Sequence, residues 1–192
     1  MSINTLVEYI PNAIPKELGD NLTHEITFPK QREKCKIFGK IYDTPRDQAL
    51  FHFCKNPVTY KYSGISIESK PATESLWVIR NWIFENIGTA NGKYDIVLVN
   101  RYLSGKDKVG WHADDEKTID QSFPIISVSF GGSRKFQIRL KKGNERPITN
   151  FNLNSGDVII MNPGCQEKLI HQIPITTAKV GTRFNLTFRS SK

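Results

Sequence analysis

The chain has 192 residues, of which 38% are hydrophobic and 24% charged, and its formal net charge is +8. This balance excludes a disordered chain, and no apolar run approaches the roughly 18 residues needed to span a bilayer. The length suits a single domain over residues 1–192. The surplus positive charge favours a polyanionic partner, nucleic acid first, and we expect no membrane partner.

The cysteines indicate a reducing compartment. Cys35, Cys54 and Cys165 are odd in number and too widely spaced for a zinc motif or a disulfide framework. The first residues lack the basic stretch and apolar run of a secretory signal. We therefore expect a soluble intracellular monomer, nuclear in a eukaryote and otherwise cytoplasmic.

Residues 1–72 are punctuated by prolines, so long helices are not expected there. Pro15 allows a short helix near 15–24, and the run 58–62 predicts a strand that ends at a Ser-Gly turn.

Residues 73–88 form the clearest predicted helix. Its apolar positions recur at spacings of three and four residues, which favours a structural helix packed against a sheet. Thr73 is placed to cap its start and Gly88 to end it.

The remainder of the chain predicts an all-β body. The expected strands are 94–103, 109–112, 124–130, 135–140, 157–162, 169–173 and 182–189. Glycine and asparagine turns separate them, which is typical of a sandwich, a jelly roll or a barrel.

His112 and Asp114 are a candidate pair of metal ligands, because residues two apart on a strand point to the same side. His171 lies in a later apolar strand, and two histidines with one carboxylate can hold Fe(II) and leave open positions. Taken alone the pattern is weak, because a single strand histidine is more often packed or exposed than a ligand.

Two further strands carry polar faces. Along residues 183–189, arginine, asparagine and threonine alternate strictly with apolar residues, which suits either a half-exposed strand or a clamp for a dicarboxylate. Asn100 and Tyr102 share one side at the end of a buried strand, either as a binding pair or as a polar sheet edge.

Four segments together are more specific than any one of them: 100–102 (NRY), 110–116 (GWHADDE), 127–131 (SVSFG) and 183–189 (RFNLTFR). With them, residues 37–189 resemble the AlkB family of Fe(II)- and 2-oxoglutarate-dependent dioxygenases, nearest the branch that repairs alkylated duplex DNA. The resemblance implies a mainly β fold with flanking helices (α+β). A double-stranded β-helix (jelly-roll) core would span 91–192, with a supporting helix at 73–90 and nucleotide-recognition hairpins within 1–72.

The resemblance also implies the cofactor site. His112, Asp114 and His171 would hold Fe(II), and O2 would be a cosubstrate. Arg183 with Tyr102 would pair with the distal carboxylate of 2-oxoglutarate. Arg189, with Asn100 and Asn185, would steady its chelating end, and Thr187 would line the same pocket.

The resemblance further implies a base pocket formed by Tyr60, Tyr62, Asp115 and Glu116. The lesions N1-methyladenine and N3-methylcytosine are cationic, so carboxylates and aromatic faces would favour them. The alternatives are solvated turn acids and aromatic packing within the strand.

DNA contacts are expected from two regions. The resemblance implies that Phe38 would fill the gap left by an extruded base, with Lys40 and Arg46 also contacting DNA. Residues 134–146 hold six basic residues and one acidic residue, which suits either a phosphate-contacting hairpin or a solvated one. The expected contacts there are Arg134, Lys135, Arg139, Lys141 and Lys142.

The implied activity is oxidative removal of N-alkyl groups from DNA bases, with release of formaldehyde, succinate and CO2. An RNA demethylase of the same chemistry is the alternative. A jelly-roll nucleic-acid-binding module without turnover is a third hypothesis, from a different class of protein, and a protein or lipid substrate is a minor fourth.

Overall fold

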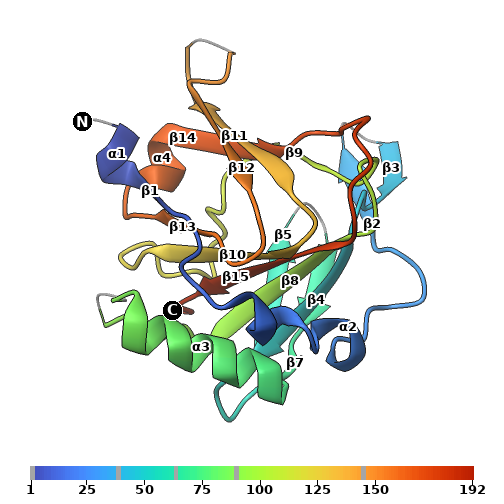
Figure 1. Ribbon diagram of the computed structural model, residues 1–192, viewed down its shortest axis with the longest axis vertical. Coiled ribbons are helices and arrows are strands. Elements are labelled where there is room, and N and C mark those ends of the chain that lie inside the picture. Colours follow the sequence, from blue (N-terminus) through green and yellow to red (C-terminus); the bar gives the residue numbers. More distant parts are fainter. Residues whose placement is uncertain (1–2, 38–39, 63–64, 89–90, 144–145) are drawn as a thin grey trace.

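Two β-sheets face each other in the computed structural model, which describes residues 3–37, 40–62, 65–88, 91–143 and 146–192 (Figure 1). The larger sheet has the order β1-β13-β10-β15-β8-β4-β7 and the smaller one β12-β11-β14-β9. All neighbouring strands are antiparallel except the pair β4–β7. This is the jelly-roll arrangement that the sequence predicted.

The larger sheet consists of β1 (Val7–Ile10), β13 (Val158–Met161), β10 (Ile125–Gly131), β15 (Arg183–Arg189), β8 (Ile96–Tyr102), β4 (Asp47–His52) and β7 (Lys70–Pro71). The smaller sheet consists of β12 (Thr149–Leu153), β11 (Arg134–Leu140), β14 (Leu169–Ile173) and β9 (Val109–His112). Two hairpins stand apart from them: β2 (Lys34–Ile37) with β3 (Lys40–Asp43), and β5 (Thr59–Tyr62) with β6 (Ile65–Glu68).

The helices are α1 (Ile3–Leu6), α2 (Leu22–Glu25), α3 (Glu74–Asn86) and α4 (Cys165–Lys168), with a 3-10 turn at Lys16–Gly19. The short helix expected near 15–24 is therefore two separate turns. Within the described ranges, no helix combines the length and apolar character that crossing a membrane would require.

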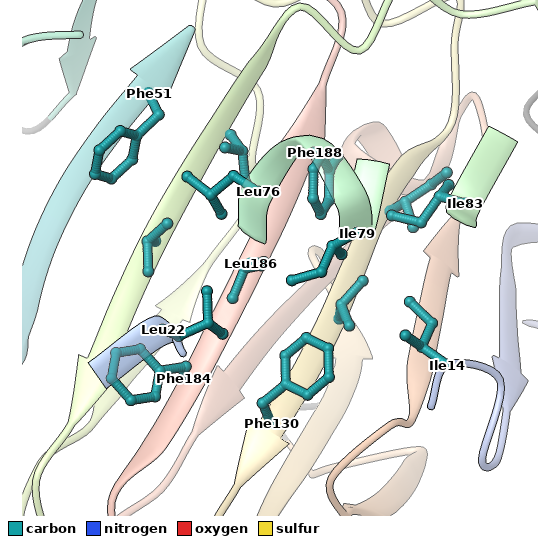
Figure 2. Close-up of a cluster of buried hydrophobic side chains, with 14 of the residues drawn as sticks. Ile14, Leu22, Phe51, Leu76, Ile79, Ile83, Phe130, Phe184, Leu186 and Phe188 are labelled. Atoms are coloured by element: carbon teal, nitrogen blue, oxygen red, sulfur yellow. The ribbon is translucent and has the colours of Figure 1, made fainter. Parts of the chain in front are cut away.

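Helix α3 covers the outer side of the larger sheet (Figure 1). Its buried residues Leu76, Ile79 and Ile83 pack toward Leu186 and Phe188 of β15 (Figure 2). Burying a side chain of this size contributes about 1.5–3 kcal/mol, so this layer stabilises the sheet that carries the site.

The ends of α3 agree only in part with the sequence. Thr73 is the N-cap residue but makes no side-chain cap bond. Instead, the Glu25 carboxylate accepts hydrogen bonds from the Ser75 amide at 3.0 Å and its hydroxyl at 2.6 Å. At the other end Gly88 has φ = +76°, the left-handed conformation expected of a terminating glycine.

A second apolar cluster fills the space between the sheets. It joins Leu98 and Ile125 of the larger sheet to Phe136, Ile138 and Ile173 of the smaller one. The functional site occupies the more polar part of the same interior.

Several strands were missed from the sequence, chiefly β1, β4 and β12. Every residue of β4 is buried, including Asp47, Gln48 and His52, so this strand shows no alternation of apolar and polar residues. The stretch 1–72 thus contributes three strands of the main sheet, β1, β4 and β7, as well as the two hairpins.

Candidate active site

A cavity of about 250 Å³ lies between the two sheets. Strand β15 supplies one wall, where Arg183, Asn185, Thr187 and Arg189 line the cavity, while its apolar residues face α3. The predicted alternation is confirmed, but all seven residues are buried rather than half-exposed. β15 is therefore the strand that joins the helix-covered core to the site.

His112, Asp114 and His171 meet in this cavity. Strands β9 and β14 are paired so that His112 lies directly opposite His171, and their ring centroids are 4.3 Å apart. The potential ligand atoms of all three residues lie within 4.8 Å of one another. The structure thus brings together the three residues that the sequence named for Fe(II).

The protonation of the two histidines suits metal binding. His112 Nδ1 lies 2.9 Å from the Gly110 carbonyl oxygen and 3.0 Å from that of His171. Because carbonyls only accept, Nδ1 carries the proton and Nε2 is left as the ligand. Burial lowers the pKa of His112, and lowers that of His171 to about 3, so both rings are neutral near pH 7.

Asp114 is held in place on three sides. Arg189 Nη2 donates to its carboxylate at 2.6 Å, and both side chains are buried. Gln166 accepts from its amide at 2.9 Å, and Gln121 donates to its carbonyl at 2.8 Å. Burial alone would raise the pKa of Asp114, but the charge of Arg189 and its hydrogen bond lower it, so the ligand is ionised.

The charge of Arg183 is buried with few hydrogen-bond partners. It is 1% exposed and donates from Nη2 to Ser129 Oγ at 2.9 Å, with its guanidinium 5.1 Å from the Tyr102 ring centroid. Within the described residues its Nε and Nη1 have no hydrogen-bond partner, and the same holds for Nε and Nη1 of Arg189. Burial lowers the pKa of Arg183 to about 10. Buried cationic donors without acceptors are suited to an anionic ligand.

Amide and hydroxyl groups complete the wall beside these arginines. Asn185 Nδ2 donates to Ser127 Oγ at 2.8 Å and to the Val128 carbonyl at 3.1 Å. Thr187 Oγ1 lies 3.4 Å from Asn185 Oδ1. Asn100 is opposite Asn185 in the neighbouring strand, so the predicted cosubstrate residues form one continuous surface.

The four expected base-pocket residues are separated by the structure. Tyr60 and Glu116 line the cavity and hydrogen-bond to each other, and burial raises the pKa of both. Asp115 lies outside the cavity, where its half-exposed carboxylate pairs with Lys141 Nζ at 2.8 Å. The side chain of Tyr62 lies outside the described part of the chain.

The expected DNA contacts also divide. Lys135, Lys141 and Lys142 are exposed, and Arg139 stacks over Trp111 with its guanidinium 4.7 Å from the ring centroid. Phe38 and the side chain of Lys40 lie outside the described residues.

Two arginines expected at the DNA surface are buried instead. Arg134 is 2% exposed and donates to the carbonyls of Ser104, Asp107 and Pro174 at 3.1, 2.7 and 2.6 Å. Its side chain shares the inward direction of the strand with Phe136 and Ile138. Arg46 is 8% exposed, lines the cavity and donates from Nε to Asn100 Oδ1. Neither guanidinium is placed on the outer surface.

Sequence reasoning missed three side chains around the site. Gln166 holds the amide of Asp114, Gln48 donates to Asn100, and the ring of Phe136 stacks 5.2 Å from that of His171. Only Gln48 had a signal in the sequence, because it is two residues from Arg46.

Comparison with known proteins agrees with this geometry. Residues 6–189 match the model of the 2OG-Fe(II) oxygenase superfamily. The DNA oxidative demethylase ALKBH2 of Mus musculus is 36% identical over 162 residues, covering 81% of this chain and 66% of that protein. For the ALKBH2 of Homo sapiens the identity is 32% over 180 residues, covering 90% and 67%.

A third relative is the alpha-ketoglutarate-dependent dioxygenase alkB homolog 3 of Rattus norvegicus, 31% identical over 157 residues and covering 78% of this chain and 51% of that protein. A solved structure described as "The structure of OsALKBH1" superposes with a TM-score of 0.60 at 16% identity, covering 96% of this chain and 97% of that one. The chain belongs to the 2OG-Fe(II) oxygenase superfamily and, within it, to the AlkB family. It spans between about half and two thirds of the length of these curated relatives.

Family membership implies Fe(II), 2-oxoglutarate and O2, and the residues present fit them. Two neutral imidazoles and one ionised carboxylate are a suitable donor set for Fe(II). Nε and Nη1 of Arg183 and Arg189, which have no partner in the described ranges, fit a dicarboxylate within the same cavity.

Proposed function

We propose that this protein is an Fe(II)- and 2-oxoglutarate-dependent oxidative demethylase of N-alkylated DNA bases. The observation that carries the proposal is a single cavity that holds the His-Asp-His cluster together with two buried arginines, each with Nε and Nη1 unmatched among the described residues. A structural ion-pair network would not leave those donors unmatched beside three potential metal ligands.

The roles of the residues follow from their positions. His112, Asp114 and His171 would hold Fe(II). Arg183 beside Tyr102 would receive the distal carboxylate of 2-oxoglutarate. Arg189, Asn100, Asn185 and Thr187 would contact the remainder of the cosubstrate. The bound iron, with 2-oxoglutarate and O2, would supply the oxidation that releases the methyl carbon as formaldehyde, with succinate and CO2 as the other products.

The protein itself positions the base and excludes water. Glu116 and Tyr60 line the cavity, interact electrostatically with Asp114 and would recognise the base. A carboxylate and an aromatic ring both favour the positive charge of N1-methyladenine and N3-methylcytosine over the neutral bases. Asp115 and Tyr62 remain proposed contacts, and Asp115 would have to leave Lys141 to reach a base.

The phosphate-binding surface is proposed to be the outer side of β11 and the turn after it. Lys135, Arg139, Lys141 and Lys142 lie there, whereas Arg134 on the same strand points inward. Basic side chains that track a phosphate backbone supply affinity without sequence preference. Because the substrate would be DNA, we also propose that the protein acts in the nucleus of a eukaryote and otherwise in the cytoplasm. We propose separately that it is a monomer.

A demethylation panel tests the substrate. N1-methyladenine and N3-methylcytosine would each be presented in single-stranded DNA, duplex DNA and RNA, with formaldehyde release as the readout. The proposal predicts turnover of both lesions in DNA. Turnover confined to RNA would establish the alternative, an RNA demethylase of the same chemistry.

A variant of Phe38 tests whether the protein acts on duplex DNA or on single strands. An apolar finger that replaces the extruded base is needed only where the opposite strand is stacked. Phe38→Ala should therefore impair turnover on duplex DNA and spare single strands. Equal activity of the variant and the parent on both substrates would contradict a duplex preference.

A binding module without turnover is the competing class of function. The intact cluster of His112, Asp114 and His171 and the two buried arginines speak against it. Failure to release succinate or formaldehyde from every methylated oligonucleotide, in the presence of Fe(II) and 2-oxoglutarate, would establish the module instead.

A further inference from the structure

Asn100 has its side-chain amide fixed by two neighbours. Arg46 Nε lies 2.7 Å from Asn100 Oδ1, and Gln48 Nε2 lies 3.1 Å from the same oxygen. All three residues are buried. The amide is therefore not free to rotate in the cavity wall.

The direction of that amide follows from chemistry alone. The nitrogen Nε of an arginine can only donate, so the atom of Asn100 that faces Arg46 must be the oxygen. Oδ1 has two lone pairs, and the two donors occupy both. What Asn100 can still offer is its NH2 group, and none of the hydrogen bonds among the described residues uses that group.

The strand register places this NH2 group in the cosubstrate wall. Gln48, Asn100 and Asn185 are direct cross-strand neighbours on β4, β8 and β15. Asn100 and Asn185 both line the cavity, beside Arg183 and Arg189. A donor at this point faces the position proposed for 2-oxoglutarate, whose oxygens can only accept.

We infer that Arg46 and Gln48 are positioning residues of the 2-oxoglutarate site, which hold the Asn100 amide with its NH2 group toward the cosubstrate. The inference rests on the proposed function, and it gives Arg46 a task inside the cavity in place of the expected contact with DNA. An arginine that contacts phosphate needs an exposed guanidinium, whereas Arg46 is 8% exposed.

A double-mutant cycle tests whether Arg46 acts through Asn100. The protein is loaded with Mn(II), which supports no turnover, and 2-oxoglutarate binding is measured by calorimetry. We expect Arg46→Met and Asn100→Ala each to weaken binding about tenfold, or about 1.4 kcal/mol. The double variant should also be weakened about tenfold, because a residue that acts only through Asn100 has nothing left to orient. Gln48→Leu should weaken binding in the same direction, and by less.

The competing result is additivity. If Arg46 attracts the dianion directly, Arg46→Met will weaken binding equally in the Asn100→Ala background and the double variant will lose about a hundredfold. That result, or unchanged affinity in Arg46→Met, would overturn the inference. Parent protein that binds no 2-oxoglutarate would instead contradict the proposed function.

Two controls exclude a general loss of structure and a DNA role. Arg80→Met removes another partly buried arginine, which bonds the carbonyls of Lys93 and Tyr94, and should leave 2-oxoglutarate affinity unchanged. Arg46→Met should also keep the parent's affinity for DNA and its dependence on salt. A fall of about one in the slope of log affinity against log salt would mark Arg46 as a phosphate contact and contradict the inference.

Discussion

The two arginines at the ends of β15 differ in what surrounds them. Arg189 has a carboxylate partner in Asp114, whereas Arg183 pairs with no carboxylate of the described residues and donates only to the hydroxyls of Ser129 and Tyr102 among them. The burial that lowers the pKa of Arg183 to about 10 also means that its charge costs free energy in the ligand-free protein. A dicarboxylate would remove that cost.

Arg183→Met should therefore separate folding from binding. The free energy of unfolding without ligand should be unchanged or higher, because a poorly compensated buried charge is replaced by an apolar group. At a hundredfold excess over its Kd, 2-oxoglutarate should stabilise the parent by about 2.7 kcal/mol and the variant hardly at all. Urea denaturation with and without 2-oxoglutarate measures both effects, and a variant that keeps the ligand effect would contradict the clamp.

Alanine variants of Asp114 and His112 should have the same effect on metal binding and different effects on stability. Asp114→Ala and His112→Ala should both abolish metal binding and turnover, as followed by Co(II) titration and succinate release. Asp114→Ala should also cost about 3–5 kcal/mol of stability, because it leaves the buried Arg189 without its partner. His112→Ala removes a neutral ring and should cost much less. Turnover retained in either variant would refute the metal assignment.

The sequence predicted the metal and cosubstrate residues better than it predicted which basic residues are exposed. Strand alternation made the polar residues of β8 and β15 candidates, and the family resemblance assigned their roles and the metal set. Arg46 was assigned to DNA by the family resemblance and Arg134 by the charge of its segment, although Arg134 shares its strand parity with the apolar Phe136 and Ile138. The carbonyl groups that bind Arg134 come from distant turns, which no local pattern indicates.

At the scale of an element, β11 carries two opposite functions on its two sides. Lys135 is exposed beside the inward Arg134. Arg134→Met should lower the free energy of unfolding by about 3 kcal/mol, because three carbonyl oxygens lose a charged donor. Lys135→Ala should leave stability unchanged and reduce the salt dependence of DNA binding by about one unit of slope. Urea denaturation measures the stability of both variants, and fluorescence anisotropy at several salt concentrations measures their DNA binding. A stable Arg134→Met with altered DNA binding, or an unstable Lys135→Ala, would contradict an inward Arg134 and an outward Lys135.

Helix α3 is a support that does not touch the cavity. Ile79 is fully buried against the larger sheet, so Ile79→Ala should cost about 2–5 kcal/mol in the free energy of unfolding (Figure 2). The affinity of folded protein for 2-oxoglutarate should stay within twofold of the parent, measured by calorimetry below the unfolding temperature. A large loss of affinity would mean that α3 shapes the site directly.

The elements that could be predicted are those whose pattern is local. The helical spacing of α3 and the alternation of β15 are visible in the chain itself. Strand β4 could not be predicted, because its buried Asp47, Gln48 and His52 are satisfied by partners elsewhere in the chain. Asp47 pairs with Arg32 and Arg101, Gln48 with Asn100, and His52 with Ser69.

At the scale of the whole molecule, the site exists because strands distant in sequence are neighbours in the sheets. β14 lies beside β9, which sets His171 opposite His112, and β15 lies between β10 and β8, which sets Asn185 beside Asn100. Periodicity in a sequence gives the side on which a residue lies but not the neighbour of its strand. The order of the strands is therefore seen only in the structure.

The net charge of +8 is also distributed unevenly through the molecule. Arg46, Arg134, Arg183 and Arg189 are all buried, so they do not add to the surface that a polyanion meets. The positively charged surface available to DNA is therefore smaller than the net charge indicates. The exposed lysines of β11 and of the turn after it are part of that surface.

The central claim is that this cavity demethylates a base in DNA with Fe(II) and 2-oxoglutarate. The most direct measurement is the mass of a DNA oligonucleotide that carries one N1-methyladenine, before and after incubation with the protein, Fe(II), 2-oxoglutarate and air. The account predicts loss of one methylene from the oligonucleotide and one succinate for each base restored, both absent with Asp114→Ala. An unchanged oligonucleotide mass with the parent protein, under conditions in which it binds both Fe(II) and 2-oxoglutarate, would contradict it.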